Sequence, residues 1–182
     1  MRKFFAVCSA LTLVSACQTA GYEPVSEKLP TLTVSFADSA WNGKIVPKGQ
    51  QCKKFGGSGA TPSLVVEGVP VEANAIIVEF NDASYMDLSS DGGHGKIGFR
   101  VSGGGKQILS SVPGQTDKVP DGTFVEKRNR ATGDYATPGY LPPCSGGRGN
   151  YYFADVKAVF KAKTEKEKSK LLAVGKIELG KY

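Results

Sequence analysis

Histidine is the scarcest chemically versatile residue in this chain, because its 182 residues contain only one, His94. A metal site needs several nitrogen, sulfur or carboxylate ligands at suitable spacing, so with one histidine and few free thiols we expect no bound metal. A hydrolase could use Ser84 or Ser145 with His94 and Asp82, but neither serine lies in a Gly-x-Ser-x-Gly elbow. The glycine-rich run 56–59 is not followed by Gly-Lys-Ser/Thr, which argues against a phosphate loop. We therefore predict no catalytic residues and no cofactor, that is, a protein that is not an enzyme.

Long apolar runs are also missing. The N-terminal run Phe4–Val14 has about eleven residues, whereas a membrane-spanning helix needs about twenty. Arg2 and Lys3 precede this run, and a basic start before a short apolar stretch is typical of a secretory signal peptide. We expect residues 1–16 to be such a signal.

The end of this segment resembles a bacterial lipobox. Val14-Ser-Ala-Cys17 predicts cleavage before Cys17 and acylation of its thiol, and several acyl chains anchor a protein stably. Ordinary secretory cleavage after Ala16 or Ala20 is the alternative. Gln18 is not the Asp that retains lipoproteins in the inner membrane. These features predict an outer-membrane lipoprotein of the bacterial cell envelope that faces the periplasm.

The chain has only four cysteines, so each can be considered in turn. Cys8 would leave with the signal peptide and Cys17 would carry lipid. Cys52 and Cys144 remain as an even pair in an oxidising compartment, which predicts a disulfide. Two buried free thiols are the alternative.

The net charge is +6, and much of the excess of positive charge lies between Lys157 and Lys181, a segment that contains eight lysines and only three glutamates. A basic surface can bind nucleic acid, but a secreted chain does not meet it, so we expect no nucleic-acid partner. Solvated lysines near an anionic membrane or envelope surface are the favoured interpretation.

Apolar and polar residues alternate in several short segments separated by Gly and Pro, which predicts a mainly β fold, an antiparallel β-sandwich. Residues 17–30 have no periodicity and read as a tether, so residues 31–182 form the single domain. Thr164-Glu-Lys-Glu167 is a capping box, and with Leu171, Leu172 and Val174 it predicts one short helix ending at Gly175. The expected strands are Leu32–Phe36, Leu64–Gly68, Ala75–Phe80, Lys96–Val101, Gln107–Val112, Thr123–Lys127 and Tyr151–Phe160, with a last short strand at Ile177 and Leu179.

The stretch 138–153 combines three prolines, four glycines, one cysteine and three tyrosines, and it leads directly into an expected strand. Such conformational restriction is typical of a rigid loop that lines a pocket. Asp82 follows another expected strand and His94 comes about a dozen residues later. A carboxylate, an imidazole and tyrosine hydroxyls meeting at one point would hold a small polar or anionic group. Asp82 capping a turn and His94 as a plain loop residue are the alternatives.

The order of these segments resembles the phosphatidylethanolamine-binding protein (PEBP) family, in its bacterial Raf kinase inhibitor-like branch. The similar stretches span residues 31–182, each short, but in the same order as in the family. They are Gly43–Pro47, Cys52 with Thr61–Leu64, Gly68–Pro70, Phe80–Ser84, Gly92–Gly95, Gly139–Tyr152 and Ala173–Tyr182.

This resemblance implies a PEBP-like sandwich whose pocket lies between the segments 80–95 and 138–152. The family pocket takes phosphate-like anions, such as a lipid headgroup or a nucleotide. The ligand-binding residues that the resemblance assigns here are Asp82, His94, Tyr140, Pro143, Asn150 and Tyr152.

The departures from the family pattern bear on the ligand. Phe80 stands where the family has its first Asp, Asn150 roughly where it has its second His, and Gly95 where it has Trp. The expected partner is a small anionic or polar ligand, or an envelope protein. The alternative is a structural or protein-interaction lipoprotein with a vestigial pocket.

Overall fold

The computed structural model describes residues 21–164 and 166–182, so the predicted signal peptide and Cys17 lie outside the described residues. This part of the chain forms short strands and three single-turn 3-10 helices. The strands are β1 Glu23–Pro24, β2 Thr33–Phe36, β3 Leu64–Val69, β4 Ala75–Asp82, β5 Lys96–Arg100, β6 Gly105–Leu109, β7 Thr123–Lys127, β8 Tyr151–Phe160 and β9 Lys170–Lys181, and the helices are η1 Lys53–Phe55, η2 Met86–Leu88 and η3 Gly133–Tyr135.

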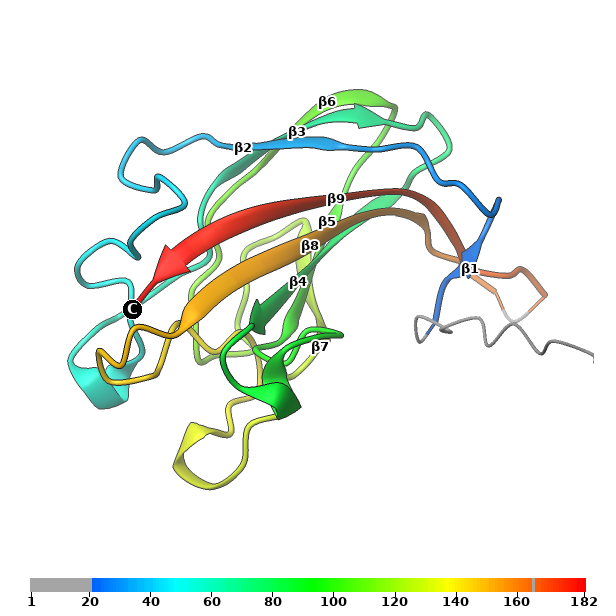
Figure 1. The fold of residues 1–182 in the computed structure, drawn as a ribbon. Helices are drawn as coiled ribbons and strands as arrows, with labels where there is room; N and C mark the ends of the chain where they lie inside the picture. The colour runs from blue at the N-terminus through cyan, green and yellow to red at the C-terminus, as the bar shows by residue number, and fades with distance from the viewer. Residues whose placement is uncertain (1–20, 165) are drawn as a thin grey trace, which may run out of the picture.

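Two sheets pack face to face, as Figure 1 shows. The larger sheet has the order β1-β9-β8-β4-β5-β7, and the smaller has the order β2-β3-β6. Neighbouring strands run antiparallel except for β1 and β9, which pair in parallel. The predictions of a mainly β fold and of an antiparallel sandwich are confirmed, and each of the eight expected strands has a counterpart, the last of them within β9.

The central strand β4 is buried along all eight of its residues. Ile76, Val78 and Phe80 face the core between the sheets, whereas Ile77 belongs to a second apolar cluster on the other face. Apolar burial on both faces explains why this segment reads as a nearly continuous apolar run rather than an alternating one. The strand ends at Asp82, which pairs in register with Tyr152 of β8. The core thus fixes the position of a carboxylate at one end of the sandwich.

The predicted helix near the C-terminus is wrong. Residues 170–181 form β9, which pairs with β8 along nearly its whole length. The proposed capping box instead makes a turn, in which the amide of Glu167 donates to the carbonyl of Thr164 at 3.2 Å. Backbone pairing with β8 and burial of Leu171 and Leu172 outweigh the local helical pattern.

The described part of the predicted tether, residues 21–30, lies against the domain instead of apart from it. β1 pairs with the start of β9, and Tyr22 and Leu29 pack on the outer face of the larger sheet. The folded domain therefore begins about ten residues earlier than residue 31, at the end of the sandwich opposite the C-terminus (Figure 1).

The expectation that the C-terminal lysines are solvated fails for Lys157. Its ammonium lies 2.8 Å from Glu79 Oε2, and Lys96 lies 2.8 Å from the other oxygen of the same carboxylate. All three side chains are buried on the outer face of the larger sheet, where the carboxylate of Glu79 forms ion pairs with both lysines. Lys96 also pairs with Asp91, which links this cluster to the loop before β5.

Within the described residues, no helix is long and apolar enough to cross a membrane.

Candidate functional site

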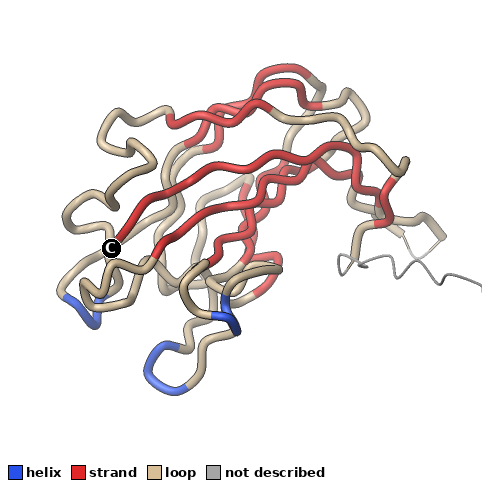
Figure 2. Tube along the Cα trace, in the orientation of Figure 1, coloured by secondary structure: helices blue, strands red, loops and turns tan. Residues whose placement is uncertain are grey.

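A pocket of about 270 Å³ opens at the end of the sandwich where β4 ends and β8 begins. Figure 2 shows the three 3-10 helices gathered at this end. The pocket is lined by residues from the segments 82–88, 130–135 and 141–152 and by His94. The ends of β4 and β8 and the turn that carries His94 supply its floor, and loops supply its rim, a common arrangement for ligand sites.

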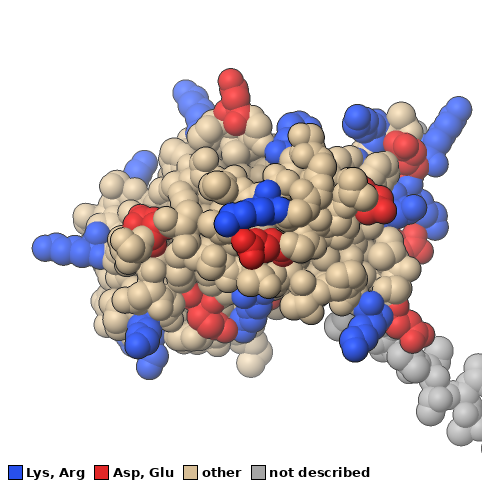
Figure 3. Space-filling model, turned by 90° about the horizontal axis from the view of Figure 1, so that it is seen from above, with Lys and Arg blue, Asp and Glu red and all other residues tan. Residues whose placement is uncertain are grey.

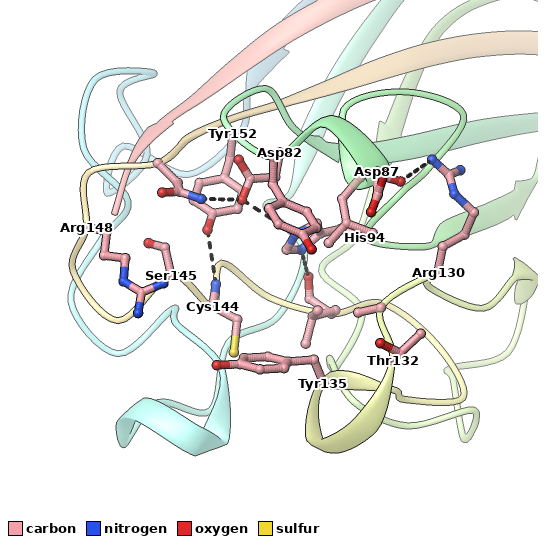
Figure 4. Close-up of a pocket in the computed structure, with 15 residues that line it drawn as sticks. Asp82, Asp87, His94, Arg130, Thr132, Tyr135, Cys144, Ser145, Arg148 and Tyr152 are labelled. Atoms are coloured by element: carbon pink, nitrogen blue, oxygen red, sulfur yellow. Dashed lines mark hydrogen bonds and ion pairs between the residues drawn. The ribbon is translucent and has the colours of Figure 1, made fainter.

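Asp82 forms one side of the floor (Figure 4) and is 3% exposed. Its Oδ1 accepts the amide of Ser84 at 2.9 Å, and its Oδ2 accepts the side-chain amide of Asn150 at 2.7 Å. The first bond is the turn-capping contact that the sequence left open as an alternative. The second bond spans 68 residues of sequence and joins the two segments that were expected to form the pocket.

His94 is fixed beside Asp82 by its backbone and by its ring. Its amide donates to the carbonyl of Phe80, and its own carbonyl accepts from Leu141, both at 2.8 Å. The ring atom Nδ1 lies 2.8 Å from the carbonyl oxygen of Leu141. A carbonyl oxygen only accepts, so Nδ1 carries the hydrogen and Nε2 of the neutral ring is an acceptor.

The neutral ring is favoured by the surroundings. Burial lowers the pKa of His94, and this effect outweighs the upward influences of the Leu141 carbonyl and of Asp82. Nε2 lies 4.0 Å from Asp82 Oδ2, which is too long for a direct hydrogen bond. Two acceptors therefore face each other across a small gap in the floor.

Tyr152 completes the floor, with its ring edge-on to His94 at 5.3 Å between ring centroids. The hydroxyl accepts the amide of Cys144 at 3.3 Å. Burial, followed by the charge of Asp82, raises the pKa of Tyr152, so the phenol keeps its proton at neutral pH. Tyr152 therefore lines the pocket and also holds the backbone at Cys144 in place.

Two arginines lie at the rim, and their environments differ. The guanidinium of Arg130 donates to the carbonyls of Asp91, Asp87 and Ser90 at 2.7–2.9 Å, which ties the loop around η2 to the loop before η3. Arg148 also lines the pocket, is exposed, and makes no hydrogen bond or ion pair within residues 21–164 and 166–182. Arg130 is committed to structure, and Arg148 is available to a ligand.

The structure brings together four of the six predicted ligand residues, Asp82, His94, Asn150 and Tyr152. Tyr140 does not line the pocket, because its ring is buried against Phe80 with centroids 4.4 Å apart. Pro143 does not line it either. Its carbonyl turns away and accepts the amide of Cys52 at 3.0 Å.

The predicted disulfide between Cys52 and Cys144 is present, with Cα atoms 5.3 Å apart. It forms a small apolar cluster with Leu141, against which Ala131 and Tyr135 pack. Cys144 itself lines the pocket. The disulfide therefore restrains the loop 141–144, whose Leu141 carbonyl accepts the hydrogen bond from His94.

The rim residues were missed by sequence reasoning. These residues come from loops and single-turn 3-10 helices without hydrophobic periodicity, and they are Tyr85, Asp87, Arg130, Thr132, Tyr135 and Arg148. The one available signal for Arg148 was its place between two glycines of the constrained stretch 138–153, where a long cation stands out.

Neither serine proposed for a hydrolase faces His94 as a nucleophile would. Ser84 Oγ accepts the amide of Tyr151 at 3.0 Å, and Ser145 Oγ donates to the backbone carbonyl of Tyr182 at 2.7 Å. Within the described ranges, no group of three His, Cys, Asp or Glu side chains could hold a metal ion. The described pocket presents hydrogen-bonding groups and the carboxylate of Asp82.

No family model matches the chain, and a search of curated proteins finds no match. Among solved structures, the chain is similar to a protein of Chlamydia trachomatis D/UW-3/CX, described as a proposed phosphatidylethanolamine-binding protein homologue. The identity is 19% and the TM-score 0.47, over 84% of this chain and 97% of the other. The family of this neighbour is the one that the order of the sequence motifs resembles.

Proposed function

We propose that this chain is a non-enzymatic ligand-binding protein of the bacterial envelope. It is anchored to the outer membrane through lipid on Cys17 and faces the periplasm. It binds a small polar or anionic ligand in the pocket between the segments 80–95 and 138–152.

The observation that carries the proposal is the floor of the pocket. Asp82, His94 and Tyr152 are each at most 3% exposed, yet all three line the cavity. Burying polar groups costs free energy unless they gain partners, and concave sites that converge a few polar groups are typical of ligand pockets. A purely structural loop would have no need to direct these three groups into a cavity.

The distribution of charge on the surface favours a small ligand over a nucleic acid as the binding partner. Figure 3 shows basic and acidic side chains interspersed over one face, with no continuous basic patch there. Several lysines are also paired with carboxylates, including Lys157 with Glu79 and Lys161 with Glu126.

A protein partner is the second candidate, and one feature favours it. Tyr85 and Met86, at the pocket rim, are 54% and 88% exposed. Exposed apolar side chains beside a pocket are common at protein interaction sites.

Intact-mass measurement of the full chain tests these proposals. The chain would be expressed with its own N-terminus and purified from membranes without reductant. We expect a mass that corresponds to cleavage before Cys17 plus acyl chains, and Cys17→Ala should lack both. An unacylated wild-type chain would refute the anchor.

Ligand binding is tested on the same material by native mass spectrometry with phosphate, phosphoethanolamine and a nucleotide. We expect a one-to-one adduct with at least one of them, lost in Asp82→Asn and kept in the exposed control Asp121→Asn. A folded protein that binds none of these compounds would contradict a working pocket and favour the protein partner.

A further inference from the structure

The segment 21–30 is fastened to the end of the sandwich opposite the pocket (Figure 1). Its strand β1 pairs with the start of β9. The Tyr22 hydroxyl donates to Glu126 Oε1 at 2.9 Å, and the ammonium of Lys161 lies 2.8 Å from the other oxygen of that carboxylate. Strand pairing and this three-residue contact hold the segment, so the described chain enters the domain at a fixed point.

The position of this entry point limits which part of the domain an anchor can hold near a membrane. Cys17 precedes Gly21 by four residues, which span at most about 14 Å. β9 runs from this end of the sandwich toward the pocket, and its twelve residues extend about 40 Å. Lipid on Cys17 would therefore hold the β1 end at the bilayer surface, and the pocket end lies beyond the reach of the tether.

A groove of about 660 Å³ lies beside the entry point. Its apolar lining includes Val25, Pro30, Pro70 and Phe160. Val25 is 50% exposed, and Val71, which follows Pro70, is 71% exposed. Exposed apolar side chains around a groove mark a site of contact, and such side chains can insert among lipid headgroups.

Lysines gather around this groove. Lys28 and Lys170 line it, and the connection 161–170 contains five lysines and two glutamates. Figure 3 shows basic side chains projecting from this end of the molecule. Four exposed lysines make no ion pair within residues 21–164 and 166–182, and they are Lys28, Lys163, Lys166 and Lys170. These ammonium groups suit anionic lipid headgroups.

Nearby acids reduce the excess of positive charge. Glu23 pairs with Lys168 at 3.3 Å, and Glu72 lines the groove. A weak contact is nevertheless sufficient, because a short tether keeps the two surfaces at an effective concentration on the order of millimolar. The lysines and the groove need only orient a domain that the anchor already holds.

We propose that the β1 end of the sandwich is a membrane-docking face, on which Val25 and Val71 contact the lipid interface and the lysines of the connection 161–170 meet anionic phospholipid headgroups. The pocket at the other end then points away from the bilayer. This inference goes beyond ligand binding, and it rests on the proposed function only for the lipid anchor on Cys17.

A polarity-sensitive fluorophore tests the orientation. The full chain, purified from membranes, would carry the label on Val71→Cys and be reconstituted in vesicles of phosphatidylcholine alone or mixed with phosphatidylglycerol. We expect a blue shift of the emission, and quenching by nitroxide lipids, that are larger with phosphatidylglycerol. The matched control is Met86→Cys at the pocket rim, which is 88% exposed and whose label should stay in water in both vesicles.

The contribution of charge is tested by a pair of triple variants in the chain labelled at position 71. Lys163→Gln, Lys166→Gln, Lys170→Gln should lose the extra shift that phosphatidylglycerol causes. Removing the same charge from exposed positions of the opposite end, with Lys44→Gln, Lys48→Gln, Lys53→Gln, should leave the shift unchanged.

The outcomes separate docking from the anchor and from ligand binding. A label at position 71 that stays in water, or equal quenching at positions 71 and 86, would overturn this face and leave the anchor and the pocket standing. Shielding of position 71 in native membranes but not in lipid vesicles would also overturn it and indicate a protein partner. An intact mass without acyl groups would refute the anchor. The face would then be judged by flotation of that chain with phosphatidylglycerol vesicles, and a chain that does not float would refute both.

Discussion

The carbonyl oxygen of Leu141 lies 2.8 Å from Nδ1 of His94, and this contact fixes which ring nitrogen carries the hydrogen. It also connects the loop braced by the disulfide to the floor of the pocket, since Leu141 packs with Cys52 and Cys144. The acceptor at Nε2 is therefore a property of the loop as much as of the histidine.

Stability should fall as the pH falls below about 6.5, the value for an unfolded histidine. The pKa of buried His94 is lowered, so between the unfolded and the folded value the unfolded chain binds more protons. The free energy of unfolding should drop by up to about 1.4 kcal/mol per pH unit in that interval. Urea unfolding at pH 7.5, 6.5 and 5.5 measures the effect.

The control for this prediction is His94→Asn, whose side-chain amide can still donate to the Leu141 carbonyl but does not titrate. Its stability should depend less on pH over the same interval. The groups that face His94 are Asp82 and Tyr152 on the neighbouring strands. An identical pH profile in wild type and His94→Asn would show that His94 does not cause the loss.

Removing the disulfide should cost about 2–5 kcal/mol, because the bridge restricts the unfolded chain over a separation of 92 residues. The double variant Cys52→Ser, Cys144→Ser should unfold at lower urea than the wild type, and reduction of the wild type should have the same effect. Equal midpoints for the oxidised wild type and the variant would contradict the prediction.

Arg130→Met should loosen the pocket rim. The guanidinium donates to three carbonyls in the segment 87–91, and methionine cannot replace any of them. Hydrogen exchange at the amides of this segment should accelerate. Arg128→Met, which removes an exposed arginine two positions away, should leave their exchange unchanged.

The buried ion cluster on the larger sheet gives a stability prediction. Glu79→Gln would leave Lys96 without its buried carboxylate partner and Lys157 without a carboxylate at 2.8 Å, and breaking such a pair costs about 3–5 kcal/mol. Glu67→Gln removes an exposed pair with Lys106 and should cost at most about 1 kcal/mol. Similar losses in both variants would show that burial does not strengthen the first cluster.

The strands were predictable from sequence because each pattern reflects which faces are buried. Thr33–Phe36 alternates and has one exposed face, whereas the continuous run of β4 has two covered faces. The segment 164–174 misled because its capping box and apolar spacing suit a helix locally. Its partner β8 lies just before this segment but is not part of the helical pattern, and the pairing with β8 decides the outcome.

The floor of the site was partly predictable for a related reason. Asp82 and Tyr152 lie at the ends of strands, so their positions follow once the strands are located. Tyr140 and Pro143 lie in a loop, where the chain direction decides whether a side chain faces the pocket or the core. The arginines at the rim come from similarly irregular loops, so no periodic pattern places them.

Strand β9 couples distant parts of the chain. It lies between β1 and β8 in the larger sheet, and the carbonyl of Tyr182 accepts from Ser145 and from Gly149 beside the pocket. The loop 145–149 is therefore held in place by the strand that also pairs with the segment 23–24 at the far end of the sheet. Any event that detaches β9 from β8 would free this side of the pocket and the β1 segment together.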